Sequence, residues 1–253
     1  MRHFFIESFH SAGRRASLSG AEARHIKNVL RLKPGDEVRL FDGTGVEYVG
    51  VIDTMPPGKV EVTITGSKPA AGCARLPVSV GQGFLKEKKM DQLVRQLSEL
   101  GAARWMPFIC DRSVARPEGG RAQARQERWR KIAVEALKQC RRGDLMQIDE
   151  IVGFDRLLER APAHDLRIVF WEQAGEPLTA QRFSGSPAGP ASVLIVLGPE
   201  GGFAEEEVRA AEAVGFISAS LGPRILRAET AAVAACAIVQ HLFGDLGARA
   251  KKS

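Results

Sequence analysis

One stretch, Ser192 to Phe203, limits what this chain can fold into more than any other: a buried strand that runs into a loop of glycines. Its opening residues, Ser-Val-Leu-Ile-Val-Leu, suit a strand buried on both faces, and Gly198-Pro199 ends that strand. Glutamates follow from Glu205 to Glu207, where the first turn of a helix has unpaired N–H groups. The stretch predicts strand, glycine loop and helix, an arrangement at which open α/β sheets bind ligands. Taken alone, the loop is also consistent with a plain tight turn.

A second stretch repeats this ending. It reads Ser220-Leu-Gly-Pro-Arg-Ile-Leu-Arg-Ala-Glu-Thr-Ala, so a strand again ends in Leu-Gly-Pro before a loop and an alanine-rich helix. Two such endings are hard to explain as unrelated turns. We interpret the two loops as facing walls of one pocket for a flat ligand, with Arg227, Glu229 and Thr230 as directional polar groups.

The N-terminal part of the chain is rich in predicted strands. Ser19 to Glu22 has the spacing of a capping box, and apolar residues follow at helical intervals. These residues are Ala23, Ile26, Val29 and Leu30. Strands are predicted at 38–40, 47–52 and 60–64, and Lys68 to Gly72 has the composition of a linker. We therefore place a domain boundary near residue 72, giving domains 1–72 and 73–253.

The second domain alternates strands with helices. Strands are predicted at 78–84, 105–110, 167–171, 193–197 and 216–221, and helices at 90–100, 205–214 and 229–243. Strands separated by helical segments indicate an α/β fold with a mostly parallel sheet and helices on both faces.

Positive charge is concentrated in one further helix of this domain. The chain has 36 Lys and Arg against 30 Asp and Glu, an excess of six. The segment from Arg121 to Arg142 holds eight basic and two acidic residues, and this difference of six equals the excess of the whole chain. Such a segment is typical of a protein that binds a polyanion, although a solvated helix face is the plain alternative. Trp129 falls in the apolar stripe of this helix and is predicted to be core.

Composition narrows the class of protein. With 253 residues, 44% hydrophobic, the chain has enough material for a sizeable core, and no apolar run has the roughly 18 residues of a membrane span. We expect a cytoplasmic protein. The four cysteines lack CxxC spacing, so free thiols in a reducing compartment and no metal site are expected.

Together the motifs resemble the SPOUT methyltransferases and, more narrowly, the bacterial 16S rRNA uracil-N3 methyltransferase family. The blocks that carry the resemblance are Leu197-Gly-Pro-Glu-Gly-Gly202, Leu221-Gly-Pro-Arg-Ile-Leu-Arg-Ala-Glu-Thr-Ala231 and Phe243-Gly-Asp-Leu-Gly247. Weaker matches include His25 to Arg31, Phe41-Asp-Gly43 and Lys89-Met90, so the resemblance covers essentially the full length.

The resemblance implies a PUA-like β-barrel for RNA in residues 1–72. It implies a SPOUT-like α/β domain in residues 73–253, whose last segment forms a trefoil knot around S-adenosylmethionine. It further implies a homodimer, no metal, and methylation of a uridine N3 in 16S rRNA, either as free rRNA or in the assembled small ribosomal subunit.

Site residues follow from the resemblance one by one. The implied cofactor-binding residues are Leu197, Gly198, Gly202, Leu221, Ile225, Leu226, Arg227 and Thr230. For catalysis, Arg227 would stabilise negative charge on the uracil oxygens, and Glu229, Glu200 or a water would accept the N3 proton. The expected RNA-binding residues are Arg24 and Arg31 on the small domain, and Arg112, Arg128, Lys131, Arg141 and Arg142 on the large one.

Two other functions stay open at this point. One is a related SPOUT enzyme that modifies a ribose 2′-hydroxyl or a tRNA base. The other is a ribosome-assembly factor that binds RNA through the same barrel and basic helix without turnover.

Overall fold

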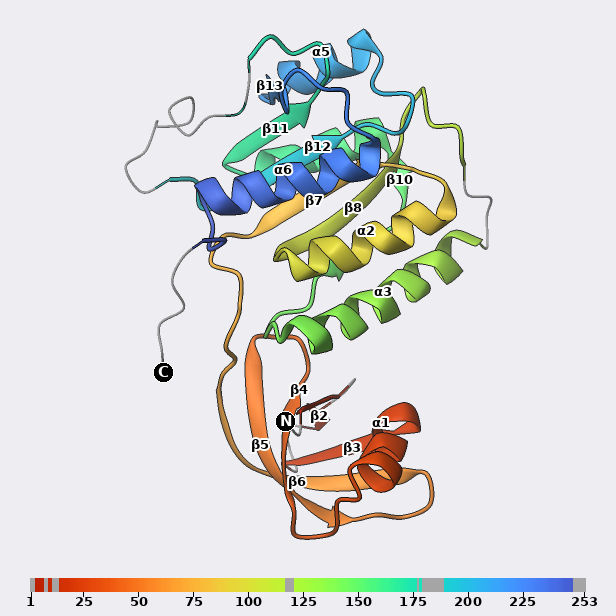
Figure 1. The fold of residues 1–253 in the computed structure, drawn as a ribbon, viewed down its shortest axis with the longest axis vertical. Coiled ribbons are helices and arrows are strands. Elements are labelled where there is room, and N and C mark those ends of the chain that lie inside the picture. Colours follow the sequence, from red (N-terminus) through yellow and green to blue (C-terminus); the bar gives the residue numbers. More distant parts are fainter. Residues whose placement is uncertain are drawn as a thin grey trace. The chain divides into compact units, whose positions relative to one another are not determined.

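The computed structural model describes residues 3–6, 9–10, 14–116, 121–176, 178 and 189–247 (Figure 1). The chain forms two compact units. The first contains Met1–Cys73 together with Val134–Leu145, and the second contains Ala74–Ala133 together with Met146–Ser253. Helix α3 (Arg121–Cys140) therefore contributes its last turns to the first unit.

A single sheet forms most of the first unit. Its strands are β1 (His3–Phe5), β2 (Phe9–His10), β3 (Arg15–Ser19), β4 (Glu37–Phe41), β5 (Val46–Thr54) and β6 (Lys59–Pro69), in the order β1-β4-β5-β6-β3-β2. Only the β1–β4 pair is parallel among these described strands. Alternate residues such as Leu18, Leu40 and Val62 are buried, which is the period of two that a half-buried sheet requires. The three predicted strands lie in β4, β5 and β6, whereas β1 to β3 were not predicted.

The capping box predicted at Ser19 is wrong. Helix α1 (Gly20–Arg24) begins without a side-chain cap from Ser19, and the chain continues as a π-helical turn, η2 (His25–Val29). The Leu30 N–H donates to the His25 carbonyl, five residues back, at 2.9 Å. This wider turn rotates the following residues off the apolar stripe, so Val29 is 69% exposed although Ile26 is fully buried.

The segment Val134–Leu145, which belongs to the first unit, is held there by backbone hydrogen bonds and an ion pair. The Gly45 N–H donates to the Gly143 carbonyl at 3.0 Å, and the Leu145 N–H donates to the Gly43 carbonyl at 2.8 Å. Lys138 forms an ion pair with Glu22. A Cβ at Gly43 would lie only 2.6 Å from the Leu145 Cβ, so glycine is required for this close approach.

A parallel sheet forms the centre of the second unit. Its strands are β7 (Val78–Gly83), β8 (Ala102–Ile109), β9 (Gln147–Ile148), β10 (Val152–Gly153), β11 (Leu166–Phe170), β12 (Val193–Leu197) and β13 (Ile217–Ala219). The order is β10-β8-β7-β12-β11-β13, with β9 beside β8, and every pair of neighbouring strands among the described residues is parallel. The predicted α/β fold with a mostly parallel sheet is therefore confirmed. The implied trefoil knot stays a prediction.

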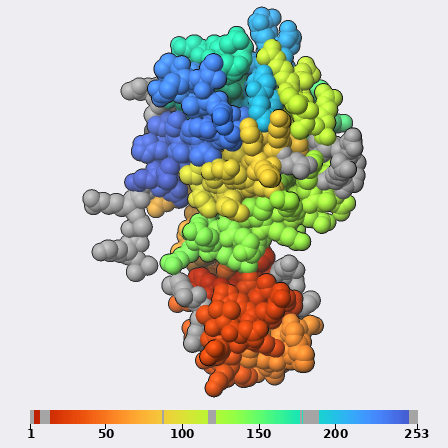
Figure 2. Space-filling model, turned by 45° about the vertical axis from the view of Figure 1, so that its right-hand side comes forward, coloured from red at the N-terminus to blue at the C-terminus, as the bar shows by residue number. Residues whose placement is uncertain are grey.

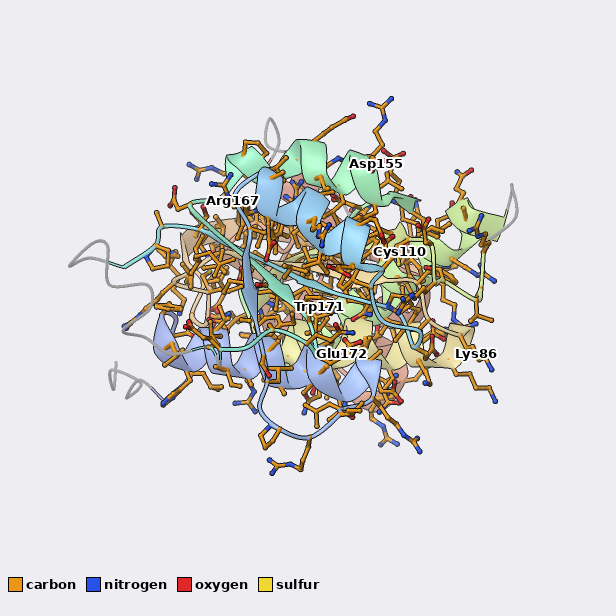
Figure 3. The ribbon with its side chains drawn as sticks, turned by 90° about the horizontal axis from the view of Figure 1, so that it is seen from above. Lys86, Cys110, Asp155, Arg167, Trp171 and Glu172 are labelled. Atoms are coloured by element: carbon orange, nitrogen blue, oxygen red, sulfur yellow. The ribbon has the colours of Figure 1, made fainter. Side chains whose placement is uncertain are left out.

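Helices cover both faces of this sheet (Figure 3). Helices α4 (Phe154–Arg160) and α5 (Glu205–Ala213) lie on one face, and α2 (Glu87–Glu99) and α6 (Ala228–Leu242) lie on the other. A short 3₁₀ turn, η3 (Ala161–Ala163), follows α4. Under α4 and α5, the rings of Phe108, Phe154 and Phe203 lie 5.1–6.1 Å apart and are buried. This core fixes the end of the loop that follows β12, because Phe203 lies at the end of that loop, just before α5.

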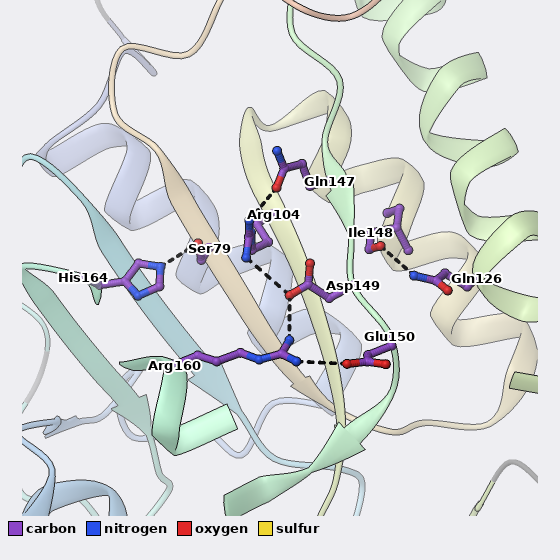
Figure 4. A network of polar contacts seen from close by, with 9 residues as sticks. All are labelled: Ser79, Arg104, Gln126, Gln147, Ile148, Asp149, Glu150, Arg160 and His164. Atoms are coloured by element: carbon purple, nitrogen blue, oxygen red, sulfur yellow. Dashed lines mark hydrogen bonds and ion pairs between the residues drawn. The ribbon is translucent and has the colours of Figure 1, made fainter. Parts of the chain in front are cut away.

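Polar side chains connect the segments at the amino-terminal edge of the sheet (Figure 4). Asp149 forms ion pairs with Arg104 at 3.6 Å and with Arg160 at 3.1 Å, and the imidazole of His164 lies 2.9 Å from the Ser79 hydroxyl. Burial lowers the pKa of His164, so this imidazole is neutral near pH 7. This edge is occupied by structural contacts, which leaves the carboxyl ends of the strands for a ligand.

Two further predictions, on Trp129 and on the cysteines, are confirmed. Trp129 is 2% exposed, as predicted, and all four cysteines are free. Within the described residues, no helix has the length and apolar character needed to span a bilayer, and no group of three or more metal-ligating side chains occurs.

Removing the carboxylate of Asp91 is expected to destabilise the second unit by about 1–2 kcal/mol. Asp91 accepts a hydrogen bond from the indole N–H of Trp129 at 3.1 Å and also pairs with Arg128. In Asp91→Ala the buried indole N–H of Trp129 has no hydrogen-bond acceptor, so its desolvation is no longer compensated and the folded state is less stable. Urea unfolding measures the change. Gln92→Ala, on the exposed side of the same helix, is the control and should change stability by less than about 0.5 kcal/mol.

Candidate active site

A pocket of about 960 Å³ opens at the carboxyl ends of β11, β12 and β13. This volume is at the upper end of the range for small-molecule sites. Segments from four parts of the second unit line it: Lys89, residues 170–175 in part, residues 197–203, and residues 220–228 with Ala231. The two Leu-Gly-Pro loops are thus brought together, as the sequence predicts.

The first wall follows β12 and is fixed by strand β7. The buried amide of Gln82 donates hydrogen bonds to the Gly198 carbonyl at 2.9 Å and to the Gly83 carbonyl at 3.0 Å. Gly83 approaches so closely that a Cβ there would lie 2.5 Å from the Pro199 nitrogen. Two neighbouring residues of β7 therefore hold the loop backbone in place. Gln82 does so through its side-chain amide, and Gly83 does so because it has no side chain and the loop can pack directly against it.

Helix α5 begins directly after this wall. The Glu207 carboxylate accepts hydrogen bonds from the N–H groups of Ala204 and Asp111, both at 2.9 Å. One of the three predicted first-turn acids thus caps the helix and also holds the loop after β8. The neighbouring Arg112 donates to the Gly201 carbonyl at 3.4 Å, which places this arginine beside the glycine loop.

The second wall follows β13. The Gly222 N–H donates to the Ser220 hydroxyl at 3.1 Å, and Gly222 has a φ of +103°, which favours glycine. The wall ends at Arg227, the residue that precedes helix α6. Arg227 is exposed and forms no ion pair with any residue that the structure describes, so its guanidinium is available to a substrate.

A third segment, after β11, was not predicted. Trp171 and Glu172 line the pocket and lie together at the end of the strand (Figure 3). The indole N–H of Trp171 is buried and finds no acceptor among the described residues. A Cβ at Gly202 would lie 3.0 Å from the Glu172 carboxylate. The predicted strand at 167–171 held the necessary signal, because ligand contacts follow the carboxyl ends of parallel strands.

Lys89 joins the two walls and was also missed. Its ammonium lies 3.2 Å from a Glu200 carboxylate oxygen and 3.1 Å from a Glu229 carboxylate oxygen. Burial alone raises the pKa of Glu229, but the backbone N–H of Glu229 and the Lys89 ammonium outweigh that effect and lower it. Pairing with Glu229 in turn raises the pKa of Lys89. Lys89 and Glu229 are therefore both charged near pH 7.

Seven of the eight predicted cofactor residues line the pocket, and Thr230 does not. The seven are Leu197, Gly198, Gly202, Leu221, Ile225, Leu226 and Arg227. Thr230 is exposed on the first turn of α6, while Ala231, the next residue, faces the pocket. Of the predicted proton acceptors, Glu200 lines the pocket. Glu229 does not line it, but it forms an ion pair with Lys89, which does.

The predicted RNA-binding residues fall into both units. Arg24, Arg31 and Arg141 are exposed in the first unit, and Arg112, Arg128 and Lys131 are exposed in the second. Arg141 and Arg142 thus belong to the first unit and not to the large domain, because the chain after the middle of α3 packs on residues 43–45. Arg142 is only 8% exposed and pairs with Asp144 at 2.9 Å, so its role is structural.

Basic helix α3 is exposed beside α2, as Figure 2 shows in green and yellow. The side chain of Arg121, one of its eight basic residues, lies outside the described part of the chain. Arg125 is turned inward, with its guanidinium 5.4 Å from the centre of the Phe84 ring. The positive charge of the segment is thus shared between surface and core.

Comparison with known proteins adds the decisive observation. A family model described as "RNA methyltransferase domain" matches residues 73–240, and a second, "RNA methyltransferase PUA domain", matches residues 18–65. The chain belongs to the RNA methyltransferase domain family. The fold of this methyltransferase is therefore the SPOUT-like α/β type, preceded by a PUA domain, as the sequence motifs predicted.

Named relatives resemble the methyltransferase over nearly its whole length. A Bacillus subtilis protein named ribosomal RNA small subunit methyltransferase E is 31% identical, over 95% of this chain and 96% of the relative. A Neisseria gonorrhoeae structure of the same name, bound to S-adenosylmethionine, is 28% identical, with a TM-score of 0.82 over 97% of this chain and 99% of that one. A Legionella pneumophila methyltransferase structure with bound cofactor matches with 28% identity and a TM-score of 0.83, over 97% of this chain and 99% of that chain.

Proposed function

We propose that this protein transfers a methyl group from S-adenosylmethionine to N3 of a uridine in small-subunit (16S) ribosomal RNA. The observation that carries the proposal is the pocket between the two Leu-Gly-Pro loops. The similar small subunit methyltransferase from Neisseria gonorrhoeae, with its bound S-adenosylmethionine, supports the choice of cofactor and RNA. Because its substrate is ribosomal RNA, the protein acts in the cytoplasm.

The residues of the pocket fit this cofactor. Apolar side chains of Leu197, Leu221 and Leu226 provide walls for an adenine, and the glycine loops allow its polar edge to reach the backbone. The buried indole N–H of Trp171 is a donor without an acceptor among the described residues, which suits a polar ligand. S-adenosylmethionine supplies an electrophilic methyl group and needs no metal.

The protein contributes to the reaction chiefly by positioning and by charge. Arg227, at the edge of the second wall, stabilises the negative charge that develops on the uracil oxygens as N3 loses its proton. Glu200 and Glu229 are both paired with Lys89, and the lowered pKa of Glu229 makes it a poor base. Because a carboxylate is still a stronger base than water, Glu200 and Glu229 stay the candidate acceptors of the N3 proton, either directly or through a water.

The RNA is held by exposed basic residues of both domains. We assign this role to Arg24 and Arg31 in the domain 1–72, and to Arg112, Arg128, Lys131 and Arg141 beyond it. Their guanidinium and ammonium groups neutralise phosphates and release counterions. We also propose a homodimer, supported by the 90% exposure of Ile225 and by apolar residues such as Val233 and Ile238 that are only half-buried on α6.

Two measurements test the proposal. Calorimetry of the purified protein with S-adenosylmethionine is expected to show binding at one site per chain, and a folded protein that binds none would overturn the enzymatic assignment. Mass spectrometry of rRNA from a strain lacking the gene is expected to show loss of N3-methyluridine from the small-subunit RNA. If cofactor binds but N3-methyluridine stays at its normal level, the substrate is wrong, and ribose methylation or tRNA is examined next.

A further inference from the structure

Lys89 occupies a position that the cofactor pocket alone does not explain. It lies in the first turn of α2, on a segment that contributes no other residue to the pocket lining. Its ammonium contacts one carboxylate from each wall, Glu200 in the glycine loop and Glu229 in the first turn of α6. The side chains are 20–32% exposed, so solvent screens these pairs less than pairs on an open surface.

The two walls have little stiffness of their own. Gly201 and Gly202 form the turn of the first wall, and Gly202 has a φ of +69°. In the second wall, Gly222 has no atom within 4 Å of the position of a Cβ. Glycine has more conformational freedom to lose than any other residue, so loops built on it need outside contacts to keep one shape.

The charges around Lys89 add a reason for its presence. Two carboxylates share one ammonium, and the other cation that acts on Glu229 is Arg227. Without Lys89, the Glu200 and Glu229 carboxylates would repel each other, and no other ion pair among the described residues would join the two walls. Lys89 therefore both attracts the walls and neutralises a repulsion between them.

We propose that Lys89 is a positioning residue, which holds the two walls of the pocket at one separation by pairing with a carboxylate from each. The inference rests on the proposed function for its activity readouts. It assigns Lys89 no contact with the reacting atoms. It predicts that loss of the ammonium affects cofactor binding and turnover together, because both depend on the distance between the walls.

The test compares Lys89→Met and Lys89→Arg with Lys88→Met. Lys88 is the adjacent exposed residue and forms no ion pair within the described residues, so it is a matched control. Lys89→Met is expected to bind S-adenosylmethionine about tenfold more weakly and to lower kcat/KM about 100-fold. Lys89→Arg keeps the charge and should stay within about threefold of the wild type in binding. Lys88→Met should match the wild type.

Hydrogen exchange provides a readout that needs no cofactor. Backbone amides in residues 198–203 and 225–231 are expected to exchange faster in Lys89→Met than in the wild type, and in both segments. Adding Glu229→Gln to Lys89→Met should slow exchange again, because it removes one of the two repelling charges. A purely local role of Lys89 would not produce this rescue.

Several results would overturn the inference. These are unchanged exchange in Lys89→Met, faster exchange in one wall only, or equal effects of Lys88→Met. If Lys89→Met and Lys89→Arg both fail to fold, Lys89 serves the whole domain and the positioning role is wrong. If the wild type binds no S-adenosylmethionine, the proposed function fails, but the exchange data still decide the role of Lys89.

Discussion

Replacing Gly83 with alanine is expected to abolish useful cofactor binding while leaving most of the fold intact. An alanine Cβ would lie 2.5 Å from the Pro199 nitrogen and 2.9 Å from the Gly198 carbonyl carbon, both of them backbone atoms that cannot rotate away. The glycine loop must therefore move. Overpacking of this kind costs about 1–3 kcal/mol, and at the upper end the affinity for S-adenosylmethionine falls about 100-fold.

The Gly83→Ala variant is measured by calorimetry with the cofactor and by urea unfolding. Gly153→Ala is the matched control, because Gly153 also lies at a strand end but has open space around the position of a Cβ and a φ of −71°. Normal binding by Gly83→Ala would mean that the first wall tolerates displacement. The pocket would then owe its shape to the second wall and the segment after β11.

The second large effect is expected for Arg227. Arg227→Ala should lower kcat about 100-fold, the usual loss when a group that stabilises transition-state charge is removed. Its effect on cofactor affinity should be less than about threefold, because apolar walls and backbone provide most of the cofactor contacts. Single-turnover methyl transfer to small ribosomal subunits, with calorimetry alongside, separates the two quantities.

Arg227→Lys refines this prediction. Lysine keeps the positive charge but loses the planar fork of donors, so an intermediate rate is expected. Arg209→Ala, on the exposed side of α5, is the control and should leave both quantities unchanged. A large loss of affinity with normal turnover in Arg227→Ala would make Arg227 a cofactor-binding residue and remove it from the chemistry.

The two walls could be predicted from the sequence because the residues that end each strand are adjacent in the chain. Leu197-Gly-Pro and Leu221-Gly-Pro each mark the end of a strand, and the rule for parallel sheets places such ends at one edge. Helix α6 and helix α5 were likewise found from periodicity and flanking residues. Lys89 could not be found in this way, because its partners are 111 or more positions away and depend on how α2 meets the sheet.

Other misses have equally specific causes. The π-helical turn at His25 changes the period of the helix, but the segment contains no glycine or proline from which this change could be predicted. Arg142 was predicted to be a surface cation because it belongs to a basic segment. It lies after the end of α3, however, where its side chain is buried and pairs with Asp144. Charge patterning detects solvent-facing helices well and buried ion pairs poorly.

The return of Val134–Leu145 to the first unit has a consequence for how the chain folds during synthesis. The backbone partners of Gly43 and Gly45 are Leu145 and Gly143, so this unit is incomplete until the ribosome has also made β7, α2 and β8. A fragment ending at residue 72 would lack these contacts and the Lys138 pair of Glu22. The two units therefore cannot mature strictly one after the other, and the N-terminal one waits for the middle of the chain.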